Sequence, residues 1–245
     1  MDGSLTGGRR SPSIERRSGE VLRARGAGAG DVARTLTALE RLGYPYAPTP
    51  LRPYAPRYLG RASDGRDCLS YIEGVTTTHP SERAETSYAR GGAMLRRLHE
   101  VTHGTALAGD GECLTHRDPG PFNTVFRDGE PVAFIDWDTA GPGEALSDLA
   151  YLAWTWRIQA IGNVPVPDQA RRLRQVRDGY GLERDVDLLG AVLRQQSGII
   201  ERSDSVRRTA DARLAALHAA ARDWATADRS LVLDNVAVFR EELDG

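Results

Sequence analysis

The segment between Cys113 and Trp137 constrains the fold more than any other part of the chain, because it interrupts an otherwise helical second half. Two apolar runs inside it flank Asp128-Gly129, and an Asp-Gly pair in that setting predicts a β-hairpin. Before and after the segment, apolar side chains recur at helical spacing. Strands set among such helical stretches predict an α+β fold.

Among the oxygen-bearing side chains of this segment, Asp118, Asn123 and Asp136 stand out by their spacing. Asn123 follows Asp118 by five positions, and Asp136 follows Asn123 by thirteen positions across the expected hairpin. The hairpin would return the chain on itself and bring Asp136 close to Asn123. A carboxylate such as Asp118 can take a proton from an attacking hydroxyl. The amide of Asn123 and the carboxylate of Asp136 are hard oxygen ligands, which suit a Mg²⁺ ion that also binds substrate phosphates.

The order His116-Arg117-Asp118, then Asn123 and a later aspartate, is a pattern of kinases. It predicts phosphoryl transfer from a Mg-nucleotide, ATP or GTP, to a hydroxyl group of a small molecule. We expect His116 to orient the loop by hydrogen bonds. Arg117 is expected either to contact phosphate or to occupy the place of a glycine.

The first 74 residues predict a small mixed or antiparallel sheet with one helix. The helix is expected to start from a cap at Asp31 and to end near Leu42, with an apolar face formed by Val32, Leu36 and Leu39. Strands are expected at 13–17, 20–25, 57–60 and 67–74, and loops at 5–13 and 44–56.

The remainder predicts a larger, mostly helical part. We expect an N-terminal nucleotide-binding lobe at 1–74 and a helical C-terminal lobe at 75–245. A helix is expected from Ser81 onward, and apolar stripes at 186–200 and 214–224 are expected to pack in a core. The functional segments would be a hinge at 69–74, a catalytic loop at 114–123 and a metal-binding strand at 132–138.

Charge and composition narrow the classes of function. The net charge of −2 gives no basic excess for nucleic acid. No run reaches the ~18 apolar residues of a membrane helix, and the N-terminus has no apolar signal core. Two cysteines are too few for a disulfide framework. These observations favour a cytoplasmic protein without a membrane partner, and they leave the oligomeric state open.

The motifs resemble those of the aminoglycoside phosphotransferase family, within the wider choline-kinase and protein-kinase-like fold. That family has a His-Gly-Asp-x-x-x-x-Asn motif, a hairpin, Ile-Asp-Trp/Phe, Gly-x-Gly and Asp-Leu-Ala. The matching residues are His116, Asp118, Asn123, Ile135-Asp136-Trp137, Gly141-Pro142-Gly143 and Asp148-Leu149-Ala150. The resemblance implies a two-lobed kinase-like fold and an acceptor that is an aminoglycoside-like antibiotic or another hydroxylated metabolite.

The resemblance also implies roles for single residues. Asp118 would be the catalytic base, and Asn123 and Asp136 would hold Mg²⁺. The backbone of Ser70 and Ile72 would bind the nucleotide base. Asp148 would have a structural role, and Asp138 would be a second acid near the metal. Gly7 and Gly8 would be the glycines that remain of a phosphate loop, or would form a plain turn.

The chain departs from the family at the residue expected to bind the nucleotide phosphates. The sequence contains no lysine, and Arg23 best matches the position where the family has one. The helix that usually supplies a glutamate partner offers Val32 there, with Asp31 as the nearest acid and Glu40 too far along. A pseudokinase that binds nucleotide without turnover therefore stays open as an alternative. A metal-dependent hydrolase using His116, Asp118 and Asp136 is a weaker one.

Overall fold

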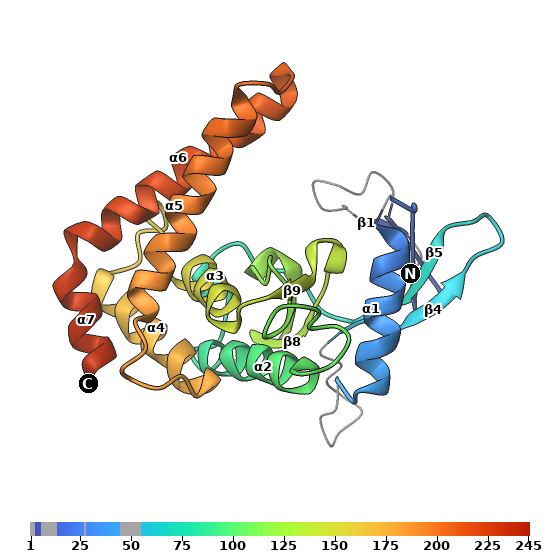
Figure 1. Ribbon diagram of the computed structural model, residues 1–245, viewed down its shortest axis with the longest axis horizontal. Helices are drawn as coiled ribbons and strands as arrows, with labels where there is room; N and C mark the ends of the chain where they lie inside the picture. The colour runs from blue at the N-terminus through green and yellow to red at the C-terminus, as the bar shows by residue number, and fades with distance from the viewer. Residues whose placement is uncertain (1–2, 6–13, 27, 45–54) are drawn as a thin grey trace. The chain divides into compact units, whose positions relative to one another are not determined.

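The computed structural model describes residues 3–5, 14–26, 28–44 and 55–245 (Figure 1). The expected loop that carries Gly7 and Gly8 lies outside the described residues, as does most of the proline-rich stretch 44–56. The chain forms two compact units. Unit 1 comprises Met1–Thr78, Glu82–Ala84 and Arg96–Ala145, and unit 2 comprises His79–Ser81, Glu85–Leu95 and Leu146–Gly245. Both the expected nucleotide-binding segment 1–74 and the segment with the kinase-like motif fall within unit 1.

The first sheet of unit 1 is antiparallel throughout, with the strand order β1-β2-β3-β5-β4. The pairing places Arg23 on β3 opposite Asp67 on β5 and Ile14 on β2. Strand β1 was not expected from the sequence, and β5 ends at Ser70 instead of continuing to Gly74. The bounds are β1 Gly3–Leu5, β2 Ile14–Arg17, β3 Glu20–Arg23, β4 Tyr58–Arg61 and β5 Asp67–Ser70.

Helix α1 (Ala29–Arg41) packs against β4 (Figure 1). Its buried face contains Val32, Leu36 and Leu39, as the helical spacing predicted. The expected cap was wrong: the N-cap is Gly28, and Asp31 lies inside the first turn. A carboxylate there still favours the helix, because the N-terminal end of a helix carries a partial positive charge.

Two short antiparallel pairs complete unit 1. Strands β7 (Thr124–Arg127) and β8 (Glu130–Phe134) form the expected hairpin. Its turn residues, Asp128 and Gly129, have φ values of +53° and +76°. Two positive φ angles in a two-residue loop match the twist of the flanking strands. The second pair joins β6 (Cys113–Thr115) to β9 (Gly141–Gly143), and the short helices η2 (Pro121–Asn123) and η3 (Trp137–Thr139) lie between them in sequence.

Unit 2 is helical, as expected. Helix α2 starts at Ser87, so the expected start at Ser81 was wrong; Pro80–Glu82 is a separate 3₁₀ turn, η1. Helix α5 packs along α6, and α4 packs against α7 (Figure 1). The helices are α2 Ser87–Thr102, α3 Ala145–Arg157, α4 Val166–Tyr180, α5 Leu188–Arg207, α6 Ala212–Asp234 and α7 Val236–Asp244. The part of α2 from Arg96 onward and the first residue of α3 belong to unit 1.

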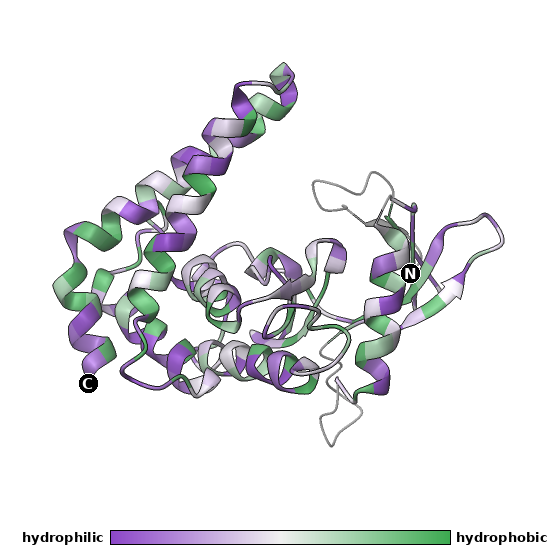
Figure 2. Ribbon diagram, viewed as in Figure 1, coloured by the Kyte–Doolittle hydropathy of each residue, from purple (hydrophilic) through white to green (hydrophobic). Residues whose placement is uncertain are grey.

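The expected core stripe at 214–224 is only partly buried. Leu214 is 41% exposed and Leu217 is 39% exposed, so these two side chains do not pack in a core as predicted. Farther along, the indole rings of Trp154 and Trp224 stack with centroids 4.3 Å apart. Hydrophobic residues gather where α6 ends and α7 begins (Figure 2). Among the described residues, no helix combines the length and the apolar character needed to cross a membrane.

Candidate active site

The ends of the segment that carries the expected catalytic residues are held together. In the β6–β9 pair, Thr115 lies opposite Gly141, and the Thr115 hydroxyl donates to the Gly141 carbonyl at 2.8 Å. A Cβ at Gly143 would approach Thr115 Oγ1 to 2.7 Å, so a side chain at this position would clash with β6. The Gly-Pro-Gly motif therefore closes residues 116–140 into one local loop, called here the closed segment.

His116 fastens the two halves of the closed segment to each other. Its Nε2 lies 3.1 Å from the Ile135 carbonyl, which can only accept, so Nε2 carries a proton. The imidazole packs beside Trp137 with ring centroids 4.6 Å apart. The Thr139 hydroxyl donates to the His116 carbonyl at 3.1 Å. His116 thus contacts both neighbours of Asp136, and its role in orienting the loop remains a prediction.

Asn123 joins the expected base to the expected metal ligand. Its side-chain Nδ2 donates to the Asp118 carbonyl at 3.0 Å. Its own carbonyl accepts from the Ile135 backbone N–H at 2.8 Å, one residue before Asp136. The hairpin therefore pairs Asn123 with Ile135, the residue before Asp136. The amide oxygen Oδ1 is the atom of this side chain that could bind a cation.

Asp136 adopts a left-handed conformation, with φ of 61°. A non-glycine residue rarely does so, and such strain is concentrated at functional sites. The amide of Asn123 and the carboxylate of Asp136 form a donor set that fits Mg²⁺, which takes one or two protein carboxylates and completes its shell with water and phosphate. The described part of the chain contains no group of three or more His, Cys, Asp and Glu side chains that could hold a metal ion.

The side chain of Arg117 turns toward the backbone of Pro142. Its φ is +66°, which accounts for the family's glycine at this position. Its Nη2 donates to the Pro142 carbonyl at 2.6 Å, and a Cβ on Gly141 would meet the guanidinium carbon at 3.1 Å. Of the two roles left open by the sequence, the contacts favour the structural one.

Arg23 extends from β3 to the end of the closed segment. Its Nη2 lies 2.5 Å from Oδ1 of Asp138 in η3. The Arg23 side chain is 9% exposed and the Asp138 side chain is 29% exposed. Sequence reasoning did not pair these residues, although the lack of a suitable acid on the helix was a signal to look elsewhere.

The expected hinge follows β5. The Ser70 N–H donates to the Arg57 carbonyl at 2.9 Å, so a base contact at Ser70 would use its carbonyl oxygen. Ile72 is buried in a cluster with Val125, Val132 and Ala133 of the hairpin. The roles of Ser70 and Ile72 in nucleotide binding remain predictions.

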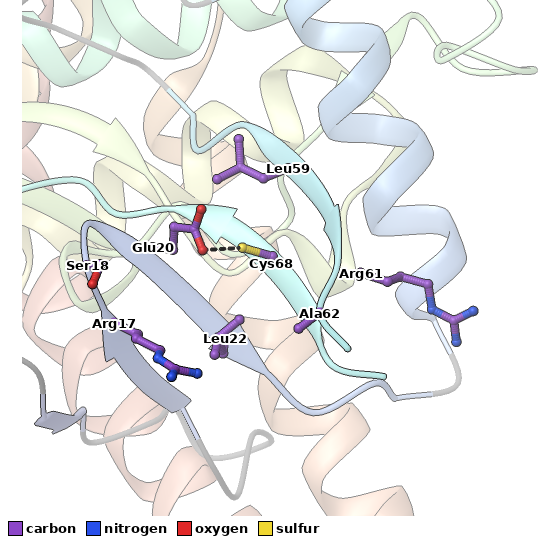
Figure 3. A pocket seen from close by; sticks show the side chains of 8 residues that line it. All are labelled: Arg17, Ser18, Glu20, Leu22, Leu59, Arg61, Ala62 and Cys68. Atoms are coloured by element: carbon purple, nitrogen blue, oxygen red, sulfur yellow. Dashed lines mark hydrogen bonds between the residues drawn. The ribbon is translucent and has the colours of Figure 1, made fainter. Parts of the chain in front are cut away.

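A cavity of about 440 Å³ lies on the five-stranded sheet of unit 1 (Figure 3). Glu20, Leu22 and Cys68 line it. Successive residues of a strand face opposite sides, so Glu20 and Leu22 lie on the face away from Arg23. This cavity is therefore separate from the candidate active site.

Comparisons with known proteins identify the family to which the chain belongs. The profile of a family described as the phosphotransferase enzyme family matches residues 5–184. The trifolitoxin immunity protein of Rhizobium leguminosarum bv. trifolii is 34% identical over 203 residues, which are 74% of this chain and 74% of that protein.

Solved structures show the same fold at low identity. A choline/ethanolamine kinase family protein from Mesorhizobium loti has a TM-score of 0.60 and 16% identity, with 100% of this chain and 92% of that chain covered. A streptomycin–ATP–APH(2″)-IIa ternary complex has a TM-score of 0.56 and 13% identity, with 89% and 90% covered. The expected kinase-like α+β fold is confirmed.

Proposed function

Because the chain belongs to the phosphotransferase enzyme family, we propose that it moves the γ-phosphoryl group of Mg-ATP or Mg-GTP to a hydroxyl of a small molecule. The observation that carries the proposal is the position of Asn123. Its side chain holds the backbone of Asp118, and its main chain pairs with the residue before Asp136. The base and the two metal ligands thus belong to one hydrogen-bonded piece of structure.

In the proposed reaction, the acceptor hydroxyl oxygen bonds to the γ-phosphorus while the bond from that phosphorus to the β-phosphate oxygen breaks. The hydroxyl proton passes to the Asp118 carboxylate, and the nucleoside diphosphate leaves. Mg²⁺ held by Asn123 and Asp136 would neutralise charge on the phosphates. Arg23 would grip the phosphates, which arginine can do with two parallel N–H groups. Positioning and electrostatic stabilisation supply most of such catalysis, and the hydrogen-bonded closed segment suits the first of these requirements.

The acceptor is proposed to be an aminoglycoside-like antibiotic or another hydroxylated toxic compound. The relative named as an immunity protein, and a neighbour solved with streptomycin and ATP, support a role in resistance. Nucleoside triphosphate as co-substrate agrees with the expected cytoplasmic location.

The test begins with nucleotide binding. MgATP and MgGTP are added separately, and the melting temperature is followed with and without EDTA. The Asp136→Ala variant should lose the magnesium-dependent part of the stabilisation that the wild type shows. A panel of hydroxylated antibiotics and metabolites is then scored for acceptor-dependent ADP or GDP release.

Asp118→Asn separates catalysis from binding. It should leave the nucleotide-induced stabilisation unchanged and reduce turnover by at least about a hundredfold, because the base is lost. Asp128→Asn is the matched control, since Asp128 lies exposed at the hairpin turn and asparagine tolerates its positive φ. Equal turnover in the two variants would rule out Asp118 as the base. Nucleotide binding without product from any acceptor would favour the pseudokinase alternative.

A further inference from the structure

The arginine expected to grip phosphate is held by an acid from an unexpected element. Arg23 Nη2 lies 2.5 Å from Asp138 Oδ1, and the arginine side chain is 9% exposed. A buried cation needs a partner that is close and well oriented, because burial removes its hydration. Asp138 is that partner in the described part of the chain.

Helix α1 does not supply this acid. Within Ala29–Arg41 the acids are Asp31 and Glu40. Asp31 pairs with Arg34 on an exposed surface, where the two side chains are 73% and 74% exposed. Glu40 accepts from Arg57 Nε at 2.7 Å. Both carboxylates are therefore engaged away from Arg23.

Helix α1 instead packs against η3, the element that carries Asp138. Tyr44, just beyond the helix, meets Trp137 edge-to-face with centroids 6.2 Å apart. Trp137 is itself 2% exposed. The apolar contact fixes η3, and η3 in turn presents Asp138 to β3.

We propose that Asp138 is a positioning residue, which holds the Arg23 guanidinium in the orientation that binds nucleotide phosphate. The inference rests on the proposed phosphotransferase function. It assigns to Asp138, two residues beyond Asp136, the contact that a helix glutamate makes in kinases with a lysine at this position.

The chemistry of arginine suits this double task. The guanidinium has five N–H donors in a planar fork, whereas the lysine ammonium is a single point of charge. One edge of the fork can serve Asp138 while the remaining N–H groups serve phosphate. Lysine in place of Arg23 would have to share one nitrogen between the carboxylate and the phosphates.

The arrangement also couples two parts of the site. Asp136 is the expected metal ligand, and Asp138 follows it after Trp137. A displacement of η3 would therefore move the metal ligand and release the phosphate grip together. The phosphate contact and the metal contact are set by one short stretch of chain.

The experiment compares Asp138→Asn and Asp138→Glu with Glu15→Gln. Glu15 is the control because it pairs with Arg66 at 2.8 Å on the same sheet, opposite Leu22 and so on the face away from Arg23. Calorimetry measures binding of MgADP, MgGDP, adenosine and guanosine, and turnover is measured with whichever triphosphate and acceptor serve the wild type.

Asp138→Asn should weaken binding of the diphosphate at least about tenfold, the typical loss for one hydrogen bond to a charged group. Binding of the matching nucleoside should stay within about twofold, because the nucleoside offers no phosphate to Arg23. Asp138→Glu should recover part of the diphosphate affinity, and Glu15→Gln should behave as the wild type. If Asp138→Asn does not fold, the comparison of Asp138→Glu with the wild type carries the same test.

A double-mutant cycle completes the test. Arg23→Met and Asp138→Asn together should weaken diphosphate binding no more than Arg23→Met alone, because Asp138 acts through Arg23. Additive losses, or equal losses for nucleoside and diphosphate, would overturn the assignment. Diphosphate binding by Asp138→Asn at wild-type strength would do so as well. Failure of the wild type itself to bind any nucleotide would refute the proposed function instead.

Discussion

Arg117 shows how one side chain can occupy a backbone position that favours glycine. Its φ of +66° is costly for a residue with a Cβ, and its guanidinium recovers a hydrogen bond to the Pro142 carbonyl. The sequence presented Arg117 only as a departure from the family motif. The structure explains the departure, because Gly141 leaves room for the guanidinium.

A pair of substitutions tests this account. Arg117→Gly and Arg117→Ala both lose the contact with Pro142, but only alanine keeps the strained φ. We expect the glycine variant to be more stable than the alanine variant by about 1 kcal/mol in urea unfolding. Equal stabilities, or a more stable alanine variant, would contradict this explanation.

Cys68 is a buried thiol with an acidic neighbour. Burial and then the Glu20 carboxylate, which accepts from Sγ at 3.1 Å, raise the pKa of Cys68 from 9.0 to about 11. The reactive thiolate should therefore be about a hundredfold scarcer near pH 8 than for an ordinary cysteine. Mass spectrometry of iodoacetamide-treated protein should show slow labelling of Cys68 in the folded state and fast labelling in urea. Similar rates in both states would refute the prediction.

Among the elements, α6 is connected to α3 by a carboxylate that has little access to water. Asp228 is 1% exposed and accepts from Trp154 Nε1 at 2.9 Å and from the Ala160 N–H at 2.7 Å. Burial raises the pKa of Asp228 from 3.8 to about 6, because the two hydrogen bonds only partly offset the loss of hydration.

The raised pKa predicts a pH-dependent stability. Between pH 4 and 6 the folded state keeps the Asp228 proton that the unfolded state has released, so stability falls as pH rises through this window. The Asp228 proton contributes about 3 kcal/mol to the free energy of unfolding below this window, and the contribution is lost above it. Urea unfolding from pH 4 to 7.5 should show that the free energy of unfolding falls less steeply with pH in Asp228→Asn than in the wild type. The slope is compared, so a difference in stability at any single pH does not affect the test. Identical pH profiles would exclude Asp228 as the source of the pH-dependent stability.

Some elements could be predicted from the sequence and others could not. The β7–β8 hairpin, the buried face of α1 and the helical second half were predictable, because turn residues and apolar spacing are local signals. The candidate site could be located because its motif is also a local signal, formed by His116, Asp118, Asn123 and Asp136. The start of α2 was misjudged because Ser81 and Glu82 lie in a separate 3₁₀ turn, which precedes the helix. The Arg23–Asp138 pair spans 115 positions of sequence, and no local pattern reports such a contact.

For the whole molecule, the division into two units does not follow the order of the chain. Helix α2 passes from unit 2, which holds its residues 87–95, into unit 1, which holds residues 96–102. A helix propagates order along its length, so neither unit can lose its part of α2 without affecting the other. We expect one cooperative thermal transition, with calorimetric and van 't Hoff enthalpies that agree. Two resolved transitions would show that the units unfold independently.

The pairing of Thr115 with Gly141 has a consequence for how such an enzyme can vary. The two ends of the closed segment meet, so the spacing of Asp118, Asn123 and Asp136 does not depend on how long the surrounding chain is. Closing so short a loop also costs little entropy, and it can form early from neighbouring residues. A change of length in the helices outside the closed segment should therefore leave the relative positions of Asp118, Asn123 and Asp136 unchanged.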